Sequence, residues 1–294
     1  MTTRPRFSVV IPAYNEEAYL GRCLDSLAAQ CFSGLVEIIV VNNNSSDRTA
    51  EVALAHGVAV LFEPAAGVCQ ARQTGTAAAS GEIVVSTDAD TVFGPGWLAR
   101  IDRILRADPD AVAVAGPCQW VGAPGWGRVY QRALFGGVDL VHRLTGRVLY
   151  VSATNIAFRR EHWTGYDLTL TQGGDELDLL RRLRSRGPVR FDRDNPTFTS
   201  ARRMNRGLFY NLFCTFLYYY LVGYLVNRLF RRRVLGMAPA FRDPAPATLP
   251  GVRAAGADVG RTGAGDGPAE RWLRAPESCA RPVAESRRPP PGTG

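Results

Sequence analysis

The stretch Phe7-Ser-Val-Val-Ile-Pro12 is a short apolar run rich in β-branched residues near the start of the chain. Similar runs recur before residue 90, and they are Val36–Val41, Val58–Phe62 and Glu82–Ser86. The segments between these runs, 18–30, 47–56 and 68–79, are each long enough for a crossover helix. Short strands that alternate with helices predict an α/β fold with a parallel sheet covered by helices.

The alternation becomes less regular after residue 95. The elements expected there are a helix at 96–107, a strand at 111–116, an apolar strand at 148–158 and a helix at 174–186. We therefore predict one domain over residues 1–203. Its first half, 1–95, has the pattern of a nucleotide-binding unit, and its second half, 96–203, is the natural place for an acceptor site.

The composition limits the classes of partner. The chain has 294 residues, 46% of them hydrophobic, which excludes a wholly disordered protein. The formal net charge is +8, but all 35 basic residues are Arg and none is Lys. With abundant Ala, Gly and Pro, this usage indicates a GC-rich coding bias rather than a surface selected for polyanions. We expect no nucleic-acid partner.

Residues 207–227 carry no charged side chain and include five tyrosines. As a helix this segment would be about 30 Å long, which matches the hydrocarbon core of a bilayer. Arginines flank it on both sides. A spanning helix, a helix in the membrane plane and a buried core helix all remain open. We predict a membrane-associated helix within 204–234, followed by a disordered tail over 235–294.

Three Asp-x-Asp triplets occur in the chain, and they differ in context. Asp108-Pro-Asp110 follows a predicted helix and Asp192-Arg-Asp194 precedes Asn-Pro, so both are typical of turns. Asp88-Ala-Asp90 instead ends a buried strand, at the sheet edge where open α/β folds place ligands. Two carboxylates at this spacing suit a hard divalent cation that also binds phosphate oxygens. A solvated turn is the alternative interpretation.

Four motifs occur in the order seen in family 2 glycosyltransferases, and they are Ser8–Glu17, Glu37–Thr49, Gly67–Glu82 and Thr87–Asp90. The chain resembles that family over roughly residues 7–203. The resemblance implies a GT-A fold, which is a Rossmann-like α/β nucleotide-diphospho-sugar transferase fold. It also implies a nucleotide-diphosphate sugar donor, a Mn²⁺ or Mg²⁺ cofactor and inversion at the anomeric carbon.

The same resemblance assigns donor-site residues. Those that match the loop lining the base and ribose are Pro12, Ala13, Tyr14 and Glu16. Asn42 and Asn43 fall where the family commonly has acids, one of which accepts from the base. An Asn amide accepts but also donates, so the identity of the base stays open.

Three charged residues match the part of the donor site that meets the diphosphate. Arg72 matches an Arg that could pair with the diphosphate, although a surface helix position is the alternative. Asp88 matches a residue beside the ribose or diphosphate, and Asp90 matches the direct metal ligand. The predicted metal site is therefore Asp90 with Asp88.

The stretch Gly173-Gly-Asp-Glu-Leu-Asp-Leu-Leu-Arg-Arg-Leu183 resembles the helix start whose second acid is the family's catalytic base. Aligning Asp178 and Arg182 puts Glu176 at that position, with Asp175 before it. The two acids are swapped relative to the usual order, so either is a candidate base. Alternatively, both act only as favourable charges at a helix N-terminus.

These observations predict a metal-dependent hexosyltransferase at the cytoplasmic face of the cell membrane, with a lipid or lipid-linked glycan as acceptor. One alternative is a catalytically silent protein that binds a nucleotide sugar or a partner. Another is a nucleotidylyltransferase. The latter would require a Gly- and Lys-rich phosphate loop, which a chain without Lys disfavours. All of these interpretations require the acids at 88 and 90 to face the same cleft as those at 175 and 176.

Overall fold

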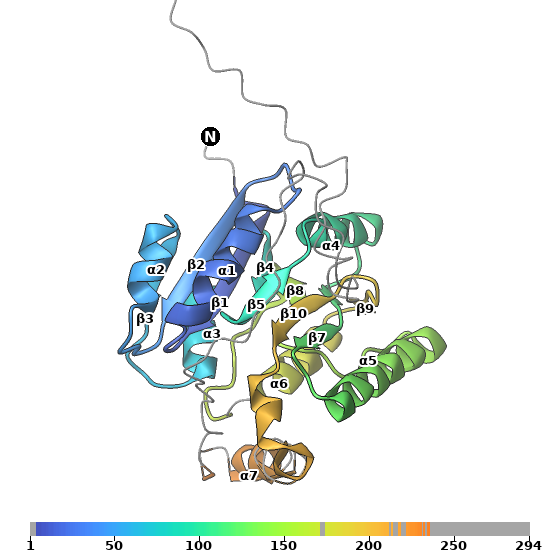
Figure 1. Ribbon diagram of the computed structural model, residues 1–294. Coiled ribbons are helices and arrows are strands. Elements are labelled where there is room, and N and C mark those ends of the chain that lie inside the picture. Colours follow the sequence, from blue (N-terminus) through green and yellow to red (C-terminus); the bar gives the residue numbers. More distant parts are fainter. Residues whose placement is uncertain are drawn as a thin grey trace, which may run out of the picture.

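The computed structural model describes residues 4–170, 174–211, 213, 217–218, 222–230, 232 and 234–235. Within this part of the chain the main sheet has seven strands in the order β3-β2-β1-β4-β8-β6-β9 (Figure 1). Their bounds in that order are Ala59–Phe62, Val36–Asn42, Phe7–Ala13, Ile83–Ser86, Ile156–Arg159, Ala113–Ala115 and Val189–Phe191.

Strands β3, β2, β1 and β4 are parallel, whereas β8 runs antiparallel to both of its neighbours. The chain winds outward from β1 through β2 to β3 and then returns to place β4 on the other side of β1. The order therefore reverses between β1 and β4. Ligands in open α/β sheets bind at such a reversal, beside the carboxyl ends of the strands.

A second, three-stranded sheet lies beside this point, with the order β5-β10-β7. Its strands are Thr91–Phe93, Thr197–Ser200 and Cys118–Val121. β5 directly follows the Asp88–Asp90 turn, and β10 pairs with it antiparallel. This pairing brings residues near 200 next to the end of β4.

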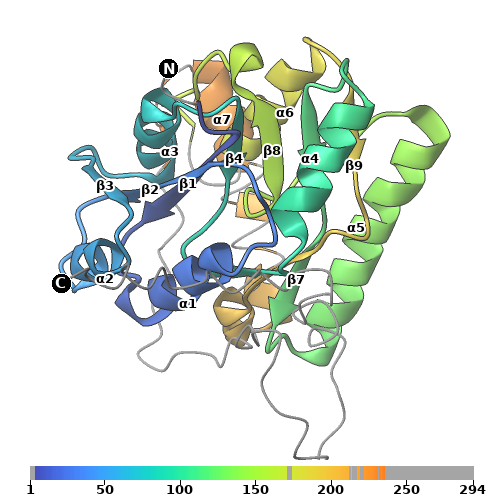
Figure 2. The ribbon, with the colours of Figure 1, turned by 90° about the horizontal axis from the view of Figure 1, so that it is seen from above.

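Helices cover both faces of the main sheet (Figures 1 and 2). Residues of α1 (Glu17–Ala28), α2 (Thr49–Ala55) and α4 (Trp97–Ala107) form one hydrophobic core with the sheet. Residues of α3 (Val68–Ala78), α5 (Gly125–Thr145) and α6 (Gly174–Arg184) form another. Short 3₁₀ turns, η1 (Arg160–His162) and η2 (Arg202–Arg206), complete the domain. The predicted α/β fold is confirmed, and the sheet is mixed rather than parallel because of β8.

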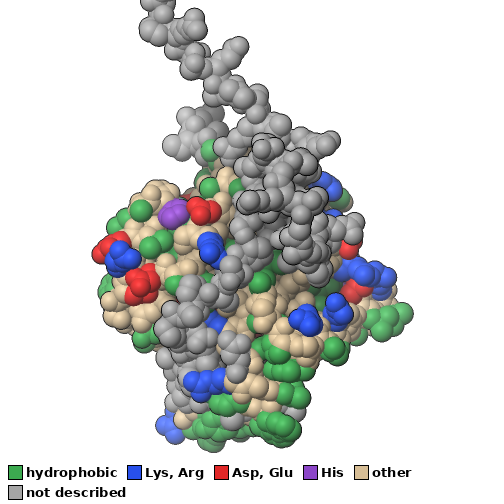
Figure 3. Space-filling view, in the orientation of Figure 1, with side chains coloured by type: hydrophobic (Ala, Val, Ile, Leu, Met, Phe, Trp, Pro, Cys, Tyr) green, Lys and Arg blue, Asp and Glu red, His purple; other side chains and the backbone are tan. Residues whose placement is uncertain are grey.

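The C-terminal prediction finds less support. No helix among the described residues is long and apolar enough to cross a membrane. α7 (Gly223–Phe230), which lies within 204–234, has eight residues. Residues 212, 214–216, 219–221, 231 and 233 of the predicted membrane helix lie outside the described residues, as do 236–294 of the predicted tail. Figure 3 shows hydrophobic side chains gathered at the end of the molecule where α7 lies.

The packing of α3 on the sheet generates a stability prediction. A Cβ added at Gly75 would lie 2.4 Å from Cγ1 of Val10 and 2.8 Å from Cγ2 of Val41, whereas one at Gly136 of α5 would meet nothing within 4 Å. We expect Gly75→Ala to lower the free energy of unfolding by about 1–3 kcal/mol through overpacking. Gly136→Ala should raise it by up to about 1 kcal/mol through helix propensity. Urea midpoints measure both, and a stabilising Gly75→Ala would contradict the tight contact.

Candidate active site

The turn after β1 is fixed to the turn after β2. Asn15 adopts a left-handed backbone conformation with φ of 53°, and its Oδ1 accepts from the backbone N–H of Ser46 (2.8 Å). The backbone N–H of Glu16 donates to the Thr49 hydroxyl (2.7 Å). Pro12 and Ala13 lie buried inside β1, whereas the Tyr14 ring is exposed at its end. Of the four residues predicted to line the base and ribose, Tyr14 therefore offers an open side-chain surface.

The amide of Asn43 holds the following loop in place. Its Nδ2 donates to the carbonyls of Glu63 and Ala65, both at 2.8 Å, and its Oδ1 accepts from the N–H of Gly67 (2.8 Å). Both amide hydrogens are thus engaged with backbone. Asn42 accepts from the N–H of Ser45 through Oδ1 (3.0 Å) and is only partly buried. Asn42 is therefore better placed than Asn43 to meet a ligand.

Arg72 of α3 joins the two groups of acids. Its guanidinium donates from Nη2 to Oδ1 of Asp88 (2.7 Å) and from Nη1 to Oδ2 of Asp175. The Arg72 and Asp175 side chains are buried, while that of Asp88 is 34% exposed. A single guanidinium therefore spans from the end of β4 to the start of α6. The convergence that the sequence interpretation required is present for Asp88 and Asp175, and Arg72 is not a surface residue.

Asp90 lies on the other side of the same turn, facing the small sheet. Its Oδ1 accepts from the Thr199 hydroxyl (2.9 Å), and its Oδ2 pairs with Nη2 of Arg202 (3.0 Å). Arg202 also contacts both carboxylate oxygens of Glu16, at 2.5 and 3.0 Å. Sequence reasoning did not assign Thr199 or Arg202 to the site. The strand that places them, β10, was not among the elements expected from the sequence.

Glu176 has a strongly perturbed carboxyl. Desolvation by burial and the neighbouring carboxylates of Asp175 and Asp88 together raise its pKa to about 8, against the opposing charges of Arg72 and Arg203. A carboxyl with this pKa exchanges its proton near neutral pH, which suits a general base. Asp175, in contrast, is the buried ion partner of Arg72.

The carboxylates around the β4 turn fit a divalent cation. Asp88, Asp90, Asp175 and Glu16 face two guanidinium groups, those of Arg72 and Arg202, which leaves two formal negative charges. Among the described residues, no three His, Cys, Asp or Glu side chains gather where they could hold a metal ion. The protein would therefore supply two carboxylates, Asp88 and Asp90, and leave other coordination positions to substrate oxygens.

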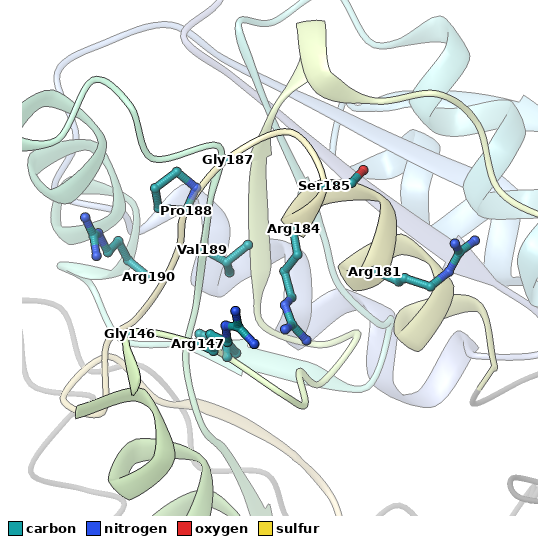
Figure 4. Close-up of a pocket in the computed structure, with 10 residues that line it drawn as sticks. Gly146, Arg147, Arg181, Arg184, Ser185, Gly187, Pro188, Val189 and Arg190 are labelled. Atoms are coloured by element: carbon teal, nitrogen blue, oxygen red, sulfur yellow. The ribbon is translucent and has the colours of Figure 1, made fainter. Parts of the chain in front are cut away.

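The other two Asp-x-Asp triplets have structural partners. Asp192 pairs with Arg100 through both of its oxygens, and Asp108 pairs with Arg190 at 2.5 Å. A cleft of about 650 Å³ lies near the C-terminal end of α6 and is lined by Arg147, Arg184 and other residues (Figure 4). It is about 15 Å along the helix from Asp175. Neither these triplets nor this cleft belongs to the acidic site.

Comparison with known proteins agrees with this geometry. A model of the family described as glycosyl transferase family 2 matches residues 8–164. Glycosyltransferase GlyA of Streptococcus pneumoniae is 35% identical over 95 residues, which are 31% of this chain and 14% of GlyA. An uncharacterized glycosyltransferase of Mycobacterium tuberculosis is 33% identical over 184 residues, which are 61% of this chain and 79% of that protein.

Solved structures share the fold. S. aureus TarS in complex with UDP has a TM-score of 0.57 at 20% identity, covering 67% of this chain and 60% of TarS. Glucosyl-3-phosphoglycerate synthase from M. tuberculosis, with Mn²⁺, UDP and glucosyl-3-phosphoglycerate, has a TM-score of 0.53 at 23% identity, covering 77% and 80%. The fold is thus that of GT-A glycosyltransferases, and the chain belongs to glycosyl transferase family 2.

Proposed function

We propose that this protein transfers a sugar from a nucleotide-diphosphate sugar to an acceptor hydroxyl. The observation that carries the proposal is the Arg72 guanidinium, which holds Asp88 and Asp175 on either side of itself. A leaving group at the β4 turn and a base at the start of α6 would then be close enough to flank one sugar ring. Family membership and the nucleotide and metal complexes of the structural relatives support this assignment.

The donor would lie along the strand ends. Tyr14 offers an exposed ring beside the β1 turn, and Asn42 offers an amide at the end of β2. An aromatic face suits stacking, and an amide can both donate to and accept from a base. Arg72 would position Asp88 at the diphosphate end, since the guanidinium and that carboxylate are hydrogen bonded.

Asp90 and Asp88 would hold the divalent cation, which supplies positive charge to stabilise the departing diphosphate. The chain's own contribution is to aim these two carboxylates. Thr199 and Arg202 fix Asp90, and Arg72 fixes Asp88. Fixed ligands reduce the reorganisation that the reaction requires.

We assign the base to Glu176. Asp175 would leave Arg72 with a single anionic partner if it took up a proton, whereas Glu176 has a pKa near neutrality. Glu176 would accept the proton of the acceptor hydroxyl as that oxygen attacks the anomeric carbon. An attack in line with the departing diphosphate inverts the configuration at that carbon.

A lipid or lipid-linked acceptor at the cytoplasmic membrane face is part of the proposal. Many apolar side chains are exposed between η2 and the end of α7, among them Leu208, Phe209, Leu225, Leu229 and Phe230. Exposed apolar surface of this kind, with arginines beside it, suits a membrane interface. The segment continues directly from β10 and η2, which border the site.

The metal assignment can be tested at Asp90. We expect Asp90→Asn to reduce Mn²⁺-dependent release of nucleoside diphosphate by at least about 100-fold, because one of two carboxylate ligands is lost. Asp110→Asn, in an exposed turn of another Asp-x-Asp triplet, is the matched control and should retain wild-type turnover. Wild-type protein that binds donors without turning over any of them would instead support a silent binding protein.

The base assignment predicts a pH dependence. The Glu176 carboxyl must lose its proton to act, so kcat should rise as pH increases through about 8 and fall below it. Glu176→Gln should abolish this limb of the kcat profile and most of the activity. Above pH 8 this variant should also have a higher thermal stability than the wild type, because it lacks the disfavoured charge of Glu176.

Asp175→Asn provides the contrast because it removes the ion partner of Arg72. It should destabilise the fold by about 3 kcal/mol or more in urea titrations. Any residual activity should keep a pH limb that is displaced to lower pH, because the Asp175 carboxylate no longer raises the pKa of Glu176. If Glu176→Gln keeps the pH limb of kcat and Asp175→Asn loses it, the base is Asp175.

Membrane association can be measured by sedimentation with phosphatidylglycerol-containing vesicles. Wild-type protein should co-sediment, and Phe209→Glu together with Leu229→Glu should reduce the bound fraction several-fold by placing charge in apolar surface. Leu54→Glu, an exposed leucine on α2, is the control. Equal sedimentation of all three proteins would argue against this surface as the membrane contact.

A further inference from the structure

Arg202 occupies a position between the predicted nucleotide loop and the predicted metal ligand. It begins η2, directly after β10, and its side chain is 11% exposed. Its guanidinium contacts Glu16 of the β1 turn and Asp90 of the β4 turn, and it lies 4.9 Å from the centroid of the Tyr19 ring. One arginine from the end of the domain therefore connects three elements of the donor half.

The electrostatics keep this arginine charged in spite of burial. Burial lowers the pKa of Arg202, but the carboxylates of Asp90 and Glu16 more than offset it and raise that pKa above its ordinary value. A buried guanidinium between two carboxylates neutralises charges that would otherwise repel each other. Arg202 thus provides positive charge at the carboxylate that the proposed function gives to the metal.

We propose that Arg202 is a resident counter-cation that competes with the divalent metal for Asp90. The proposal rests on the metal site of the proposed function. Both oxygens of Asp90 have protein partners, Thr199 on Oδ1 and Arg202 on Oδ2, so a metal that binds either oxygen shares this carboxylate with Arg202 unless it displaces the guanidinium. Glu16 can retain the guanidinium after such displacement, because it contacts Arg202 through both of its own oxygens.

The repulsion between a guanidinium and a divalent cation that share one carboxylate lowers metal affinity. At a separation of about 4–6 Å and the dielectric constant of water, this repulsion already changes a dissociation constant by about tenfold. Arg72 does not act in the same way, because it pairs with Asp88 and Asp175 rather than with Asp90. Metal affinity is therefore set by Arg202 as well as by the acids.

The test is a Mn²⁺ titration of the full chain without donor, with free Mn²⁺ followed by electron paramagnetic resonance. Arg202→Gln should bind Mn²⁺ about tenfold more tightly than the wild type. Arg202→Lys keeps the charge and should stay close to the wild type. Arg100→Gln is the matched control, since Arg100 pairs with both acids of the Asp192/Asp194 triplet, and it should leave the Mn²⁺ affinity unchanged.

A second variant keeps the proposal testable if Arg202→Gln does not fold. Glu16→Gln removes the group that competes with Asp90 for Arg202, so it should weaken Mn²⁺ binding several-fold. Unchanged or weaker binding by folded Arg202→Gln would overturn the competition and leave Arg202 as a positioning residue for Asp90. Absence of Mn²⁺ binding in both the wild type and Arg202→Gln would overturn the metal site itself, which separates the two proposals.

Discussion

The buried guanidinium of Arg72 is the contact on which the geometry of the site depends. It holds a carboxylate from the turn after β4 and another from the start of α6, two segments separated by almost ninety residues. Removing one partner of a buried ion pair typically destabilises a protein by about 3–5 kcal/mol, because the remaining charge stays buried. The same contact that positions the acids therefore penalises any arrangement that separates them.

The fold supplies the partners of this contact through its strand order. β1 and β4 are neighbours and parallel, so the turns that follow them lie at one edge of the sheet. α3 runs antiparallel to these strands and packs on β1 through Gly75. β10 then pairs with β5 immediately after Asp90 and brings Thr199 and Arg202 to the same edge. The positions of the site residues therefore depend both on the turns after β1 and β4 and on the long-range pairing of β10 with β5.

The strands of the donor half could be predicted from sequence because they are short and rich in β-branched residues, and because β1 and β4 are buried along their whole length. β1 to β4 lie within one or two residues of the expected ranges, as do α4 and the start of α6. The strand expected over 148–158 was wrong for its first part, since only Ile156–Arg159 pairs in the sheet. α5 was not predicted because glycines weaken its local helix signal, and it is stabilised by packing of residues such as Phe135 and Val138.

Some site residues could likewise be predicted from the sequence and others could not. The acids at 88, 90, 175 and 176 could be found because they follow strands or begin a helix in a family motif. The role of Arg202 could not, because its partners are 112 and 186 residues away, and its sequence context was interpreted as the flank of a membrane segment. The hydrogen bonds by which Asn43 holds the next loop could not be predicted either, because its partners are backbone groups of that loop.

The exchanged order of the two acids on α6 has a physical explanation. The helix N-terminus favours both negative charges by only about 0.3–1 kcal/mol each, which cannot offset the burial of two adjacent carboxylates. Arg72 pairs directly with Asp175. Desolvation and the neighbouring Asp175 carboxylate raise the pKa of Glu176. With Glu176 as the proposed base, one acid at the start of α6 is ion paired with Arg72 and the next can exchange a proton.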